Sequence, residues 1–227
     1  MNKLFKFFSK IRYPNSYDSE TLVKYIRKRG GNVGKNVYIY DSCHARIDIN
    51  NAHFISIGNN VLITEGVIVL GHDYSYSVVA NVYSELLKKQ RKTVIGNNVF
   101  LGMNAIILMG AEIGDNSIIG AGSVVSGILE GNAVYAGNPA KKICSIEEYY
   151  HRLKDNFVRS AEIYAQSKAD SIEQMSVYRV LFEEHDSFRE YIRRQHFNGI
   201  SSDVVNNLNI DDYPHLKWED LGKTERK

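Results

Sequence analysis

Some kinds of residue and segment are scarce in this chain of 227 residues, and each scarcity excludes a class of protein. Two cysteines, Cys43 and Cys144, are too few for a disulfide framework or a zinc knuckle, and they fit a reducing compartment. No apolar run reaches the length of about 18 residues that a membrane-spanning helix requires. A formal net charge of +2 gives no electrostatic argument for nucleic-acid binding. We therefore expect a folded, cytoplasmic protein.

A six-residue period dominates the middle of the chain. In TVIGNNVFLGMNAIILMGAEIGDNSIIGAGSVV, residues 93–125, an aliphatic residue recurs at every sixth position. These first positions of the hexads are Ile95, Leu101, Ile107, Ile113, Ile119 and Val125, and the fifth positions, up to Leu129, are mostly small. A period of six matches neither the helical period of about 3.6 nor the strand period of about 2, so it indicates a structural repeat.

The same period extends upstream from Val33 to Val69, and residues 71–92 interrupt it. In this register Ala45 and Asn51 take first positions, and Cys43 takes a fifth position as a small core residue. Gly, Asn and Asp between these positions permit sharp corners with positive φ. Three short strands per turn would then form a triangular solenoid of about four to five coils. An ordinary β-sandwich fits the two registers poorly.

Helical patterns flank the repeat on both sides. In the N-terminal segment, 1–32, a helix is expected over 19–29 as a cap on the open first coil. Residues 1–12 have an apolar face and a lysine face; we favour packing on the solenoid or on a neighbouring subunit, with peripheral membrane contact as the alternative. The C-terminal region, 144–227, is expected to be helical, with three helices within 145–198 that begin at capping boxes.

The hexads, the interruption and the motifs IGAGSVV and YAGNPAKKI together resemble the hexapeptide-repeat acyltransferases. The likeness is closest to the galactoside and maltose acetyltransferases, the xenobiotic acetyltransferases and the surface-polysaccharide O-acetyltransferases. It covers roughly residues 33–143 and implies a mainly β fold, a left-handed parallel β-helix, which is an exception to the usual right-handed crossover. It also implies acetyl-CoA as co-substrate and no metal.

The resemblance implies that His72, in VLGHDYSY, is the catalytic base. A sugar hydroxyl is a poor nucleophile near neutral pH, and a neutral imidazole can accept its proton as it attacks a thioester. The alternative is a structural histidine. A zinc hydratase of the carbonic anhydrase type is disfavoured, because the chain has no histidine between residues 73 and 150 to complete a three-histidine site.

Candidate acceptor-binding residues follow from the interrupting loop, because a long loop in a compact repeat is usually functional. Tyrosines can stack on sugar rings, and a glutamate can pair with His72 or with an acceptor hydroxyl. Two early histidines can border the same cleft. The candidates are Tyr74, Tyr76, Tyr83, Glu85, His44 and His53. The alternative is that the loop packs on an adjacent subunit for structural reasons only.

The resemblance also implies the donor site. Acetyl-CoA would lie along the later coils in a groove between two subunits, with main-chain groups at its thioester and pantetheine parts and lysines at its phosphates. The matching positions are Met103, Ala121, Ser126, Gly127, Lys141 and Lys142. One solenoid offers a flat face rather than an enclosed groove, so we expect a homotrimer with threefold symmetry.

The sequence thus predicts an acetyl-CoA-dependent O-acetyltransferase that acts on a saccharide, a precursor of a capsule or lipopolysaccharide, by direct transfer. The alternatives are an N-acetyltransferase of a nucleotide amino sugar, a xenobiotic acetyltransferase and a solenoid scaffold without activity. A scaffold has no need for His72 beside a long loop or for the AGNPAK motif.

Overall fold

The structure, a computed structural model, describes residues 3–153. The chain divides into two compact units, Met1–Ile146 and Glu147–Lys227. A helix begins at residue 146, next to the predicted capping box, and the rest of the three predicted C-terminal helices lies outside the described residues. Within the described part of the chain, no helix is long and apolar enough to cross a membrane.

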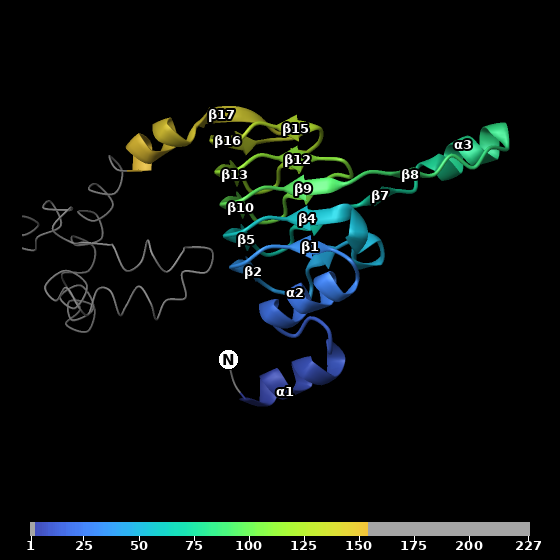
Figure 1. Ribbon diagram of the computed structural model, residues 1–227, viewed down its shortest axis with the longest axis horizontal. Coiled ribbons are helices and arrows are strands. Elements are labelled where there is room, and N and C mark those ends of the chain that lie inside the picture. The colour runs from blue at the N-terminus through green and yellow to red at the C-terminus, as the bar shows by residue number, and fades with distance from the viewer. Residues whose placement is uncertain (1–2, 154–227) are drawn as a thin grey trace, which may run out of the picture. The chain divides into compact units, whose positions relative to one another are not determined.

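Short parallel strands build three sheets that wrap around one core (Figure 1). The first sheet contains β1 (Asn32–Val33), β4 (Ile55–Ile57), β9 (Thr93–Ile95), β12 (Glu112–Ile113) and β15 (Ile128–Leu129). The second contains β2 (Val37–Ile39), β5 (Val61–Ile63), β10 (Val99–Leu101), β13 (Ser117–Ile119) and β16 (Ala133–Ala136), with β17 (Lys141–Ser145) antiparallel at its edge. The third contains β3 (Arg46–Ile47), β6 (Ile68–Val69), β11 (Ile106–Ile107) and β14 (Val124–Val125). The predicted parallel solenoid is confirmed.

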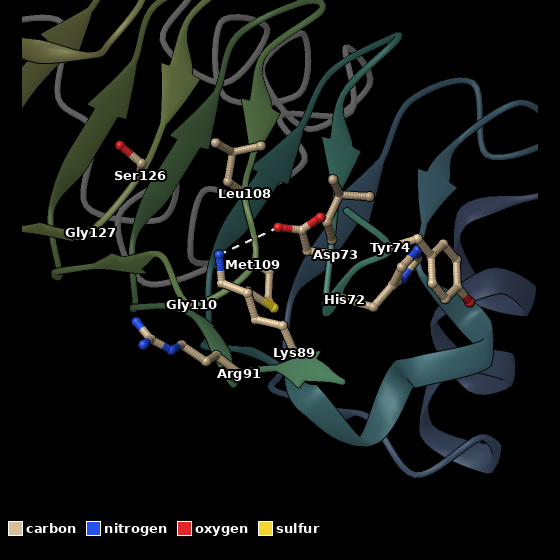
Figure 2. A pocket seen from close by; sticks show the side chains of 11 residues that line it. His72, Asp73, Tyr74, Lys89, Arg91, Leu108, Met109, Gly110, Ser126 and Gly127 are labelled. Atoms are coloured by element: carbon tan, nitrogen blue, oxygen red, sulfur yellow. Dashed lines mark hydrogen bonds and ion pairs between the residues drawn. The ribbon is translucent and has the colours of Figure 1, made fainter. Parts of the chain in front are cut away.

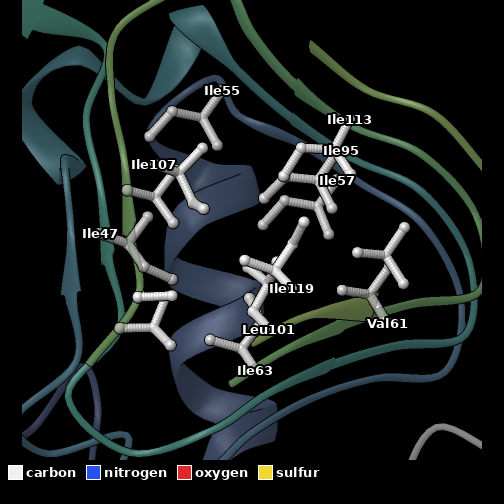
Figure 3. Packing of buried hydrophobic residues seen from close by; sticks show 14 of the residues in the cluster. Ile47, Ile55, Ile57, Val61, Ile63, Ile95, Leu101, Ile107, Ile113 and Ile119 are labelled. Carbon is white, nitrogen blue, oxygen red and sulfur yellow. The ribbon is translucent and has the colours of Figure 1, made fainter. Parts of the chain in front are cut away.

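The aliphatic first positions stack in rows along the solenoid axis (Figure 3). Ile57 pairs with Ile95, which pairs in turn with Ile113, and each of the three is at most 2% exposed. The small fifth positions Ala105 and Ala111 are fully buried. Burial of an aliphatic side chain contributes about 1.5–3 kcal/mol, so each position in these rows adds a favourable contribution of that order.

Asparagines form the corner between the first and second sheets. Asn36, Asn60, Asn98, Asn116 and Asn132 all adopt positive φ, between 53° and 60°. Asn98 donates from its side-chain amide to Asn116 at 2.9 Å, and Asn116 donates to Asn132 at 2.8 Å. Asparagine tolerates the left-handed conformation better than most residues, and here the amides also link successive coils.

The predicted register is wrong between residues 41 and 54. Ile47, and not Ala45, pairs with Val69, and a 3₁₀ helix, η1 (Ile49–Phe54), occupies the place of the next strand. Asp48 caps η1 by accepting a hydrogen bond from the Asn51 amide at 3.2 Å, so local side-chain capping competes successfully with the repeat. Cys43 is only half-buried and lies in a turn, with its sulfur 3.8 Å from the Tyr17 carbonyl oxygen, so it is not a core residue of a strand.

The last coil also departs from the register. Leu129, predicted at a fifth position, pairs with Ile113, and Tyr135 pairs with Ile119. The coil from Ile113 to Leu129 is two residues shorter than the coil from Ile95 to Ile113. Leu129 therefore continues the row of first positions.

Two helices precede the solenoid, α1 (Lys3–Arg12) and α2 (Ser19–Lys28). Asp18 caps α2, accepting a hydrogen bond from the Thr21 amide at 2.9 Å. Leu22, Val23 and Ile26 of α2 are buried and belong to the same core as the coils, so α2 covers the open first coil. On α1, Phe8 and Ile11 are 59% and 65% exposed in the single chain.

The predicted interruption is confirmed and forms an arm that projects from the solenoid (Figure 1). Two short antiparallel strands, β7 (His72–Asp73) and β8 (Lys89–Gln90), lead to and from a helix, α3 (Tyr76–Tyr83). No residue of α3 is buried. The helix was not predicted, because the sequence was interpreted there as a loop.

Candidate active site

His72 lies where the chain leaves the solenoid and enters the arm. The last hydrogen bond of the coil joins the Leu70 amide to the Ile107 carbonyl oxygen at 3.0 Å. Gly71 follows, and it passes so close to η1 that a β-carbon would lie 3.2 Å from both the Asn51 carbonyl oxygen and the Phe54 β-carbon. A glycine at this position thus lets the next residue, His72, approach η1.

Asp48 is the hydrogen-bond partner of His72. Its Oδ2 contacts the Nδ1 atom of His72, and the Gly71 amide donates to the same oxygen at 3.2 Å. Its Oδ1 accepts from the Asn51 amide at 3.2 Å and from the Asn51 side chain at 3.1 Å. The Asp48 side chain is 5% exposed and the His72 side chain is 22% exposed, so the pair is shielded on the carboxylate side and open on the imidazole side.

The charge of Asp48 fixes the tautomer of His72. Burial works to raise the pKa of the Asp48 carboxyl, but the hydrogen bonds from His72, Asn51 and Gly71 outweigh burial and hold the pKa below its usual value. An ionised carboxylate can only accept hydrogen bonds, so the neutral imidazole carries its proton on Nδ1. The other ring nitrogen, Nε2, then presents a lone pair and has no hydrogen-bond partner among the described residues.

Two further residues hold this pair in place. Gln90, which pairs with His72 across the base of the arm, donates from its side-chain amide to Asn51 Oδ1 at 3.1 Å. The ring of Tyr74 lies against the imidazole, with ring centroids 4.2 Å apart. The histidine is therefore oriented from both strands of the arm and from η1, an arrangement typical of a general base with a positioning carboxylate.

A pocket of about 550 Å³ opens beside His72 (Figure 2). It runs along the corner between the third and first sheets, where three successive coils and the base of the arm meet. Its lining residues are Leu70, His72, Asp73, Tyr74, Lys89, Arg91, Leu108, Met109, Gly110, Ser126 and Gly127. Four of the residues predicted from the sequence, namely His72, Tyr74, Ser126 and Gly127, are thus brought together.

The other predicted donor-site residues lie elsewhere in the single chain. Met103 and Ala121 follow β10 and β13, so they stand at the corner between the second and third sheets, on adjacent coils. Both are exposed. Lys141 and Lys142 are exposed on β17, and neither lines the pocket.

The remaining acceptor candidates are dispersed. The ring of Tyr76, the first residue of α3, lies 6.1 Å from that of Tyr74. Tyr83, the last residue of α3, and Glu85 are exposed and do not line the pocket. Asp48, not Glu85, occupies the place predicted for a carboxylate partner of His72, because Asp48 reaches it directly from the adjacent coil.

His44 and His53, the two early histidines, do not line the pocket. His44 contacts Asp41 and the Tyr13 hydroxyl, at 2.8 and 3.1 Å. His53 is exposed beside Phe54. No group of three or more His, Cys, Asp or Glu side chains within the described residues has the arrangement of a metal site.

The sequence interpretation missed several residues of the site. Asp48 and Asn51 contact the imidazole, Gln90 holds Asn51, and Lys89 and Arg91 line the pocket. Asp48 and Asn51 are three positions apart, which is a capping signal for a short helix, but no local pattern links them to a histidine 24 positions after Asp48.

A left-handed parallel β-helix built from hexads is the fold of the hexapeptide-repeat transferases. The family model for bacterial transferase hexapeptide (six repeats) matches residues 92–127. Protein CapG of Staphylococcus aureus is 41% identical over 131 residues, which are 58% of this chain and 75% of CapG. The chain therefore belongs to the bacterial transferase hexapeptide family.

Two further relatives extend this assignment. Galactoside O-acetyltransferase of Escherichia coli K12 is 35% identical over 136 residues, 56% of this chain and 64% of the relative. The putative lipopolysaccharide biosynthesis O-acetyl transferase WbbJ of the same strain is 33% identical over 126 residues, 52% of this chain and 61% of the relative. The chain thus spans less than two thirds of the length of these two relatives. Both relatives carry the names of acetyl-transferring enzymes.

Proposed function

We propose that the chain is an acetyl-CoA-dependent O-acetyltransferase whose acceptor is a saccharide, a precursor of a surface polysaccharide such as a capsule or lipopolysaccharide. The observation that carries this proposal is the Asp48–His72 pair at the edge of the pocket. The printed names of the galactoside enzyme and of WbbJ support a saccharide acceptor and acetyl transfer to oxygen.

His72 acts as the general base in this proposal. A hydroxyl of the acceptor donates a hydrogen bond to the free Nε2 and attacks the thioester carbonyl carbon of acetyl-CoA. Its proton passes to Nε2 as the new C–O bond forms, and Asp48 stabilises the imidazolium through Nδ1. The tetrahedral intermediate then expels the CoA thiolate, which takes the proton back from Nε2. The products are the acetyl ester and CoA, without a covalent acyl-enzyme.

The donor binds along the pocket corner and against a second copy of the chain. Leu108 and Met109 line the pocket from one coil, and Ser126 and Gly127 line it from the next, so this wall suits an uncharged pantetheine arm. In a trimer with threefold symmetry, the corner that carries Met103 and Ala121 meets the pocket corner of the neighbouring copy. The donor site then takes residues from two chains, and Lys141 and Lys142 contact the CoA phosphates.

The test measures release of free CoA from acetyl-CoA with a panel of saccharides and amino sugars, followed by mass spectrometry of the products. We expect acetyl esters of saccharides, and a loss of kcat of roughly 10²–10⁴-fold in His72→Asn. His53→Asn is the matched control, because His53 is an exposed histidine outside the pocket. Transfer to amines alone, or parental turnover in His72→Asn, would refute the proposal.

A further inference from the structure

The segment that returns from the arm, β8 and the residue after it, presents two basic side chains to the same pocket. Lys89 and Arg91 both line it, and Gln90 between them donates to Asn51 behind the histidine. Lys89 lies in β8 and Arg91 follows β8 directly. Cationic side chains are thus added to the pocket by the arm and not by the hexads.

The two cations differ in how far they are already paired. The Lys89 ammonium lies 3.4 Å from an Asp73 carboxylate oxygen, an ion pair drawn in Figure 2. A hydrogen bond from the Ser75 amide, at 2.8 Å, and the Lys89 ammonium lower the pKa of Asp73, so its charge offsets that of Lys89. Arg91 makes no ion pair or hydrogen bond within residues 3–153.

The stem of Arg91 is nevertheless held against the wall of the pocket. A β-carbon on Gly110 would lie 3.0 Å from the Arg91 Cδ and 3.1 Å from its Cβ, so the stem runs directly over the glycine. Gly110 in turn is fixed, because its amide donates to the Thr93 hydroxyl at 3.1 Å. Figure 2 shows the guanidinium beside Gly110, on the coil next to His72. A docked stem with an unpaired guanidinium is suited to a bound anion.

We propose that Arg91, assisted by Lys89, forms an anion subsite of the acceptor pocket, so that the preferred acceptor carries a carboxylate or phosphate group near the acetylated hydroxyl. This inference rests on the proposed function. A guanidinium binds both groups through two parallel hydrogen bonds, which fixes the orientation of the acceptor as well as its affinity. Acidic sugars supply the carboxylate, and sugar phosphates or nucleoside diphosphate sugars supply the phosphate.

The position of Arg91 favours the acceptor over the donor as the source of the anion. Acetyl-CoA carries its phosphates at the end of the pantetheine arm remote from the thioester, and its reacting end is uncharged. Arg91 follows directly after Gln90, the residue that pairs with His72 across the base of the arm. Arg91 therefore enters the pocket from the base of the arm, which also carries the general base.

The test uses acceptors that share a pyranose ring and differ in an anionic group at C6 or C1: methyl glucoside, methyl glucuronide and glucose 1-phosphate, and the same three in the galactose series. We expect a higher kcat/KM for anionic members in the parent. Arg91→Gln should lower kcat/KM roughly tenfold for these acceptors through KM, with neutral acceptors and the KM of acetyl-CoA unchanged. Lys92→Gln is the control, because it removes the same charge outside the pocket.

The outcomes separate the sources of the anion. A preference for the glucuronide or galacturonide assigns a carboxylate, and a preference for the sugar phosphate assigns a phosphate. A rise confined to the KM of acetyl-CoA, or equal losses for neutral and anionic acceptors, would overturn the subsite. Transfer to neutral sugars that depends on His72 but ignores charge would also overturn it, while leaving the proposed function standing.

A binding measurement decides the case in which none of these sugars is turned over. Calorimetric titration of the parent and of Arg91→Gln with glucuronate, galacturonate and glucose 1-phosphate reports on the subsite without catalysis. Weaker binding of an anion to the variant supports the proposal. Absence of binding to the parent, or equal binding to both proteins, contradicts it.

Discussion

Replacing Asp48 with asparagine tests the site at its buried end with a change of a single group. The four donors that surround the carboxylate are His72 Nδ1, the Gly71 amide and two nitrogens of Asn51. An asparagine amide has one oxygen and one NH₂ group, so it can satisfy only one side of this set. The NH₂ group of the new asparagine must then face the donors of either Asn51 or His72 and Gly71.

The consequence for catalysis depends on which side the new amide satisfies. If its NH₂ group faces His72, Nδ1 must accept, the imidazole proton moves to Nε2, and the base is lost. If its oxygen faces His72, the tautomer survives but the negative charge that stabilises the imidazolium is gone. We expect kcat to fall by roughly 10²–10⁴-fold, as for loss of a general base or of its orienting carboxylate.

The consequence for stability follows from the same contacts. A donor left unpaired beside a side chain that is 5% exposed costs about 1–3 kcal/mol. The pKa of Asp48 is lowered in the folded state. Its carboxylate therefore contributes stability at pH values above its unfolded pKa, about 3.9, and this contribution is lost as the pH falls through the lower folded pKa. The difference between parent and Asp48→Asn should be full at pH 7 and shrink in acid.

Two assays check this reasoning. Steady-state kinetics with a saccharide that the parent acetylates gives kcat, and urea unfolding at pH 7 and pH 3 gives the free energies of unfolding. Asp41→Asn is the control, because Asp41 pairs with His44 outside the pocket. Parental kcat in Asp48→Asn would refute a positioning role. A stability difference that grows in acid would refute the linkage.

Three further predictions concern the core, the donor and the assembly. Ile107→Ala removes a side chain with no exposed surface and should lower the free energy of unfolding by about 2–5 kcal/mol in thermal or urea unfolding. Ile128→Ala, at a site 76% exposed, should lower it little. Equal effects would contradict the view that the buried rows stabilise the solenoid. Lys141→Ala should weaken acetyl-CoA binding by about 1–3 kcal/mol in calorimetry, with a smaller loss against 3′-dephospho-CoA, and an unchanged dissociation constant would exclude a phosphate contact. Light scattering should give a trimer, and a stable, active monomer at micromolar concentration would rule out sites shared between chains.

The repeat was predictable from the sequence because each coil must place a residue in the same rows. Ile95, Ile113 and Ile119 are all buried in the core, and a polar residue at any of these positions would disrupt it. Aliphatic residues therefore recur at a fixed period that can be recognised in the sequence. The prediction failed around Asp48, where a capping side chain stabilises η1 instead of another strand. Capping of this kind depends on only a few residues, so the six-residue period is the stronger signal in the sequence and predicts a strand where η1 forms.

The chemistry of the site was only partly predictable for a different reason. His72 could be found because it stands where the period stops, and Ser126 and Gly127 because they belong to a motif. Asp48 reaches His72 only through the stacking of η1 beneath the arm, and Arg91 reaches the pocket only through the return of β8. Such contacts depend on the path of the chain between coils, which the hexads do not specify.

The two ends of the solenoid bear on a hazard of every open stack of strands, the growth of fibres from identical chains. A bare first coil could accept the last coil of another molecule and continue the parallel ladders without limit. Here α2 covers the first coil with Leu22, Val23 and Ile26. At the opposite end β17 runs antiparallel to β16, so the edge of the second sheet presents reversed polarity to any copy that approaches in register. The cap at the first coil and the reversed strand at the last thus both oppose end-to-end polymerisation.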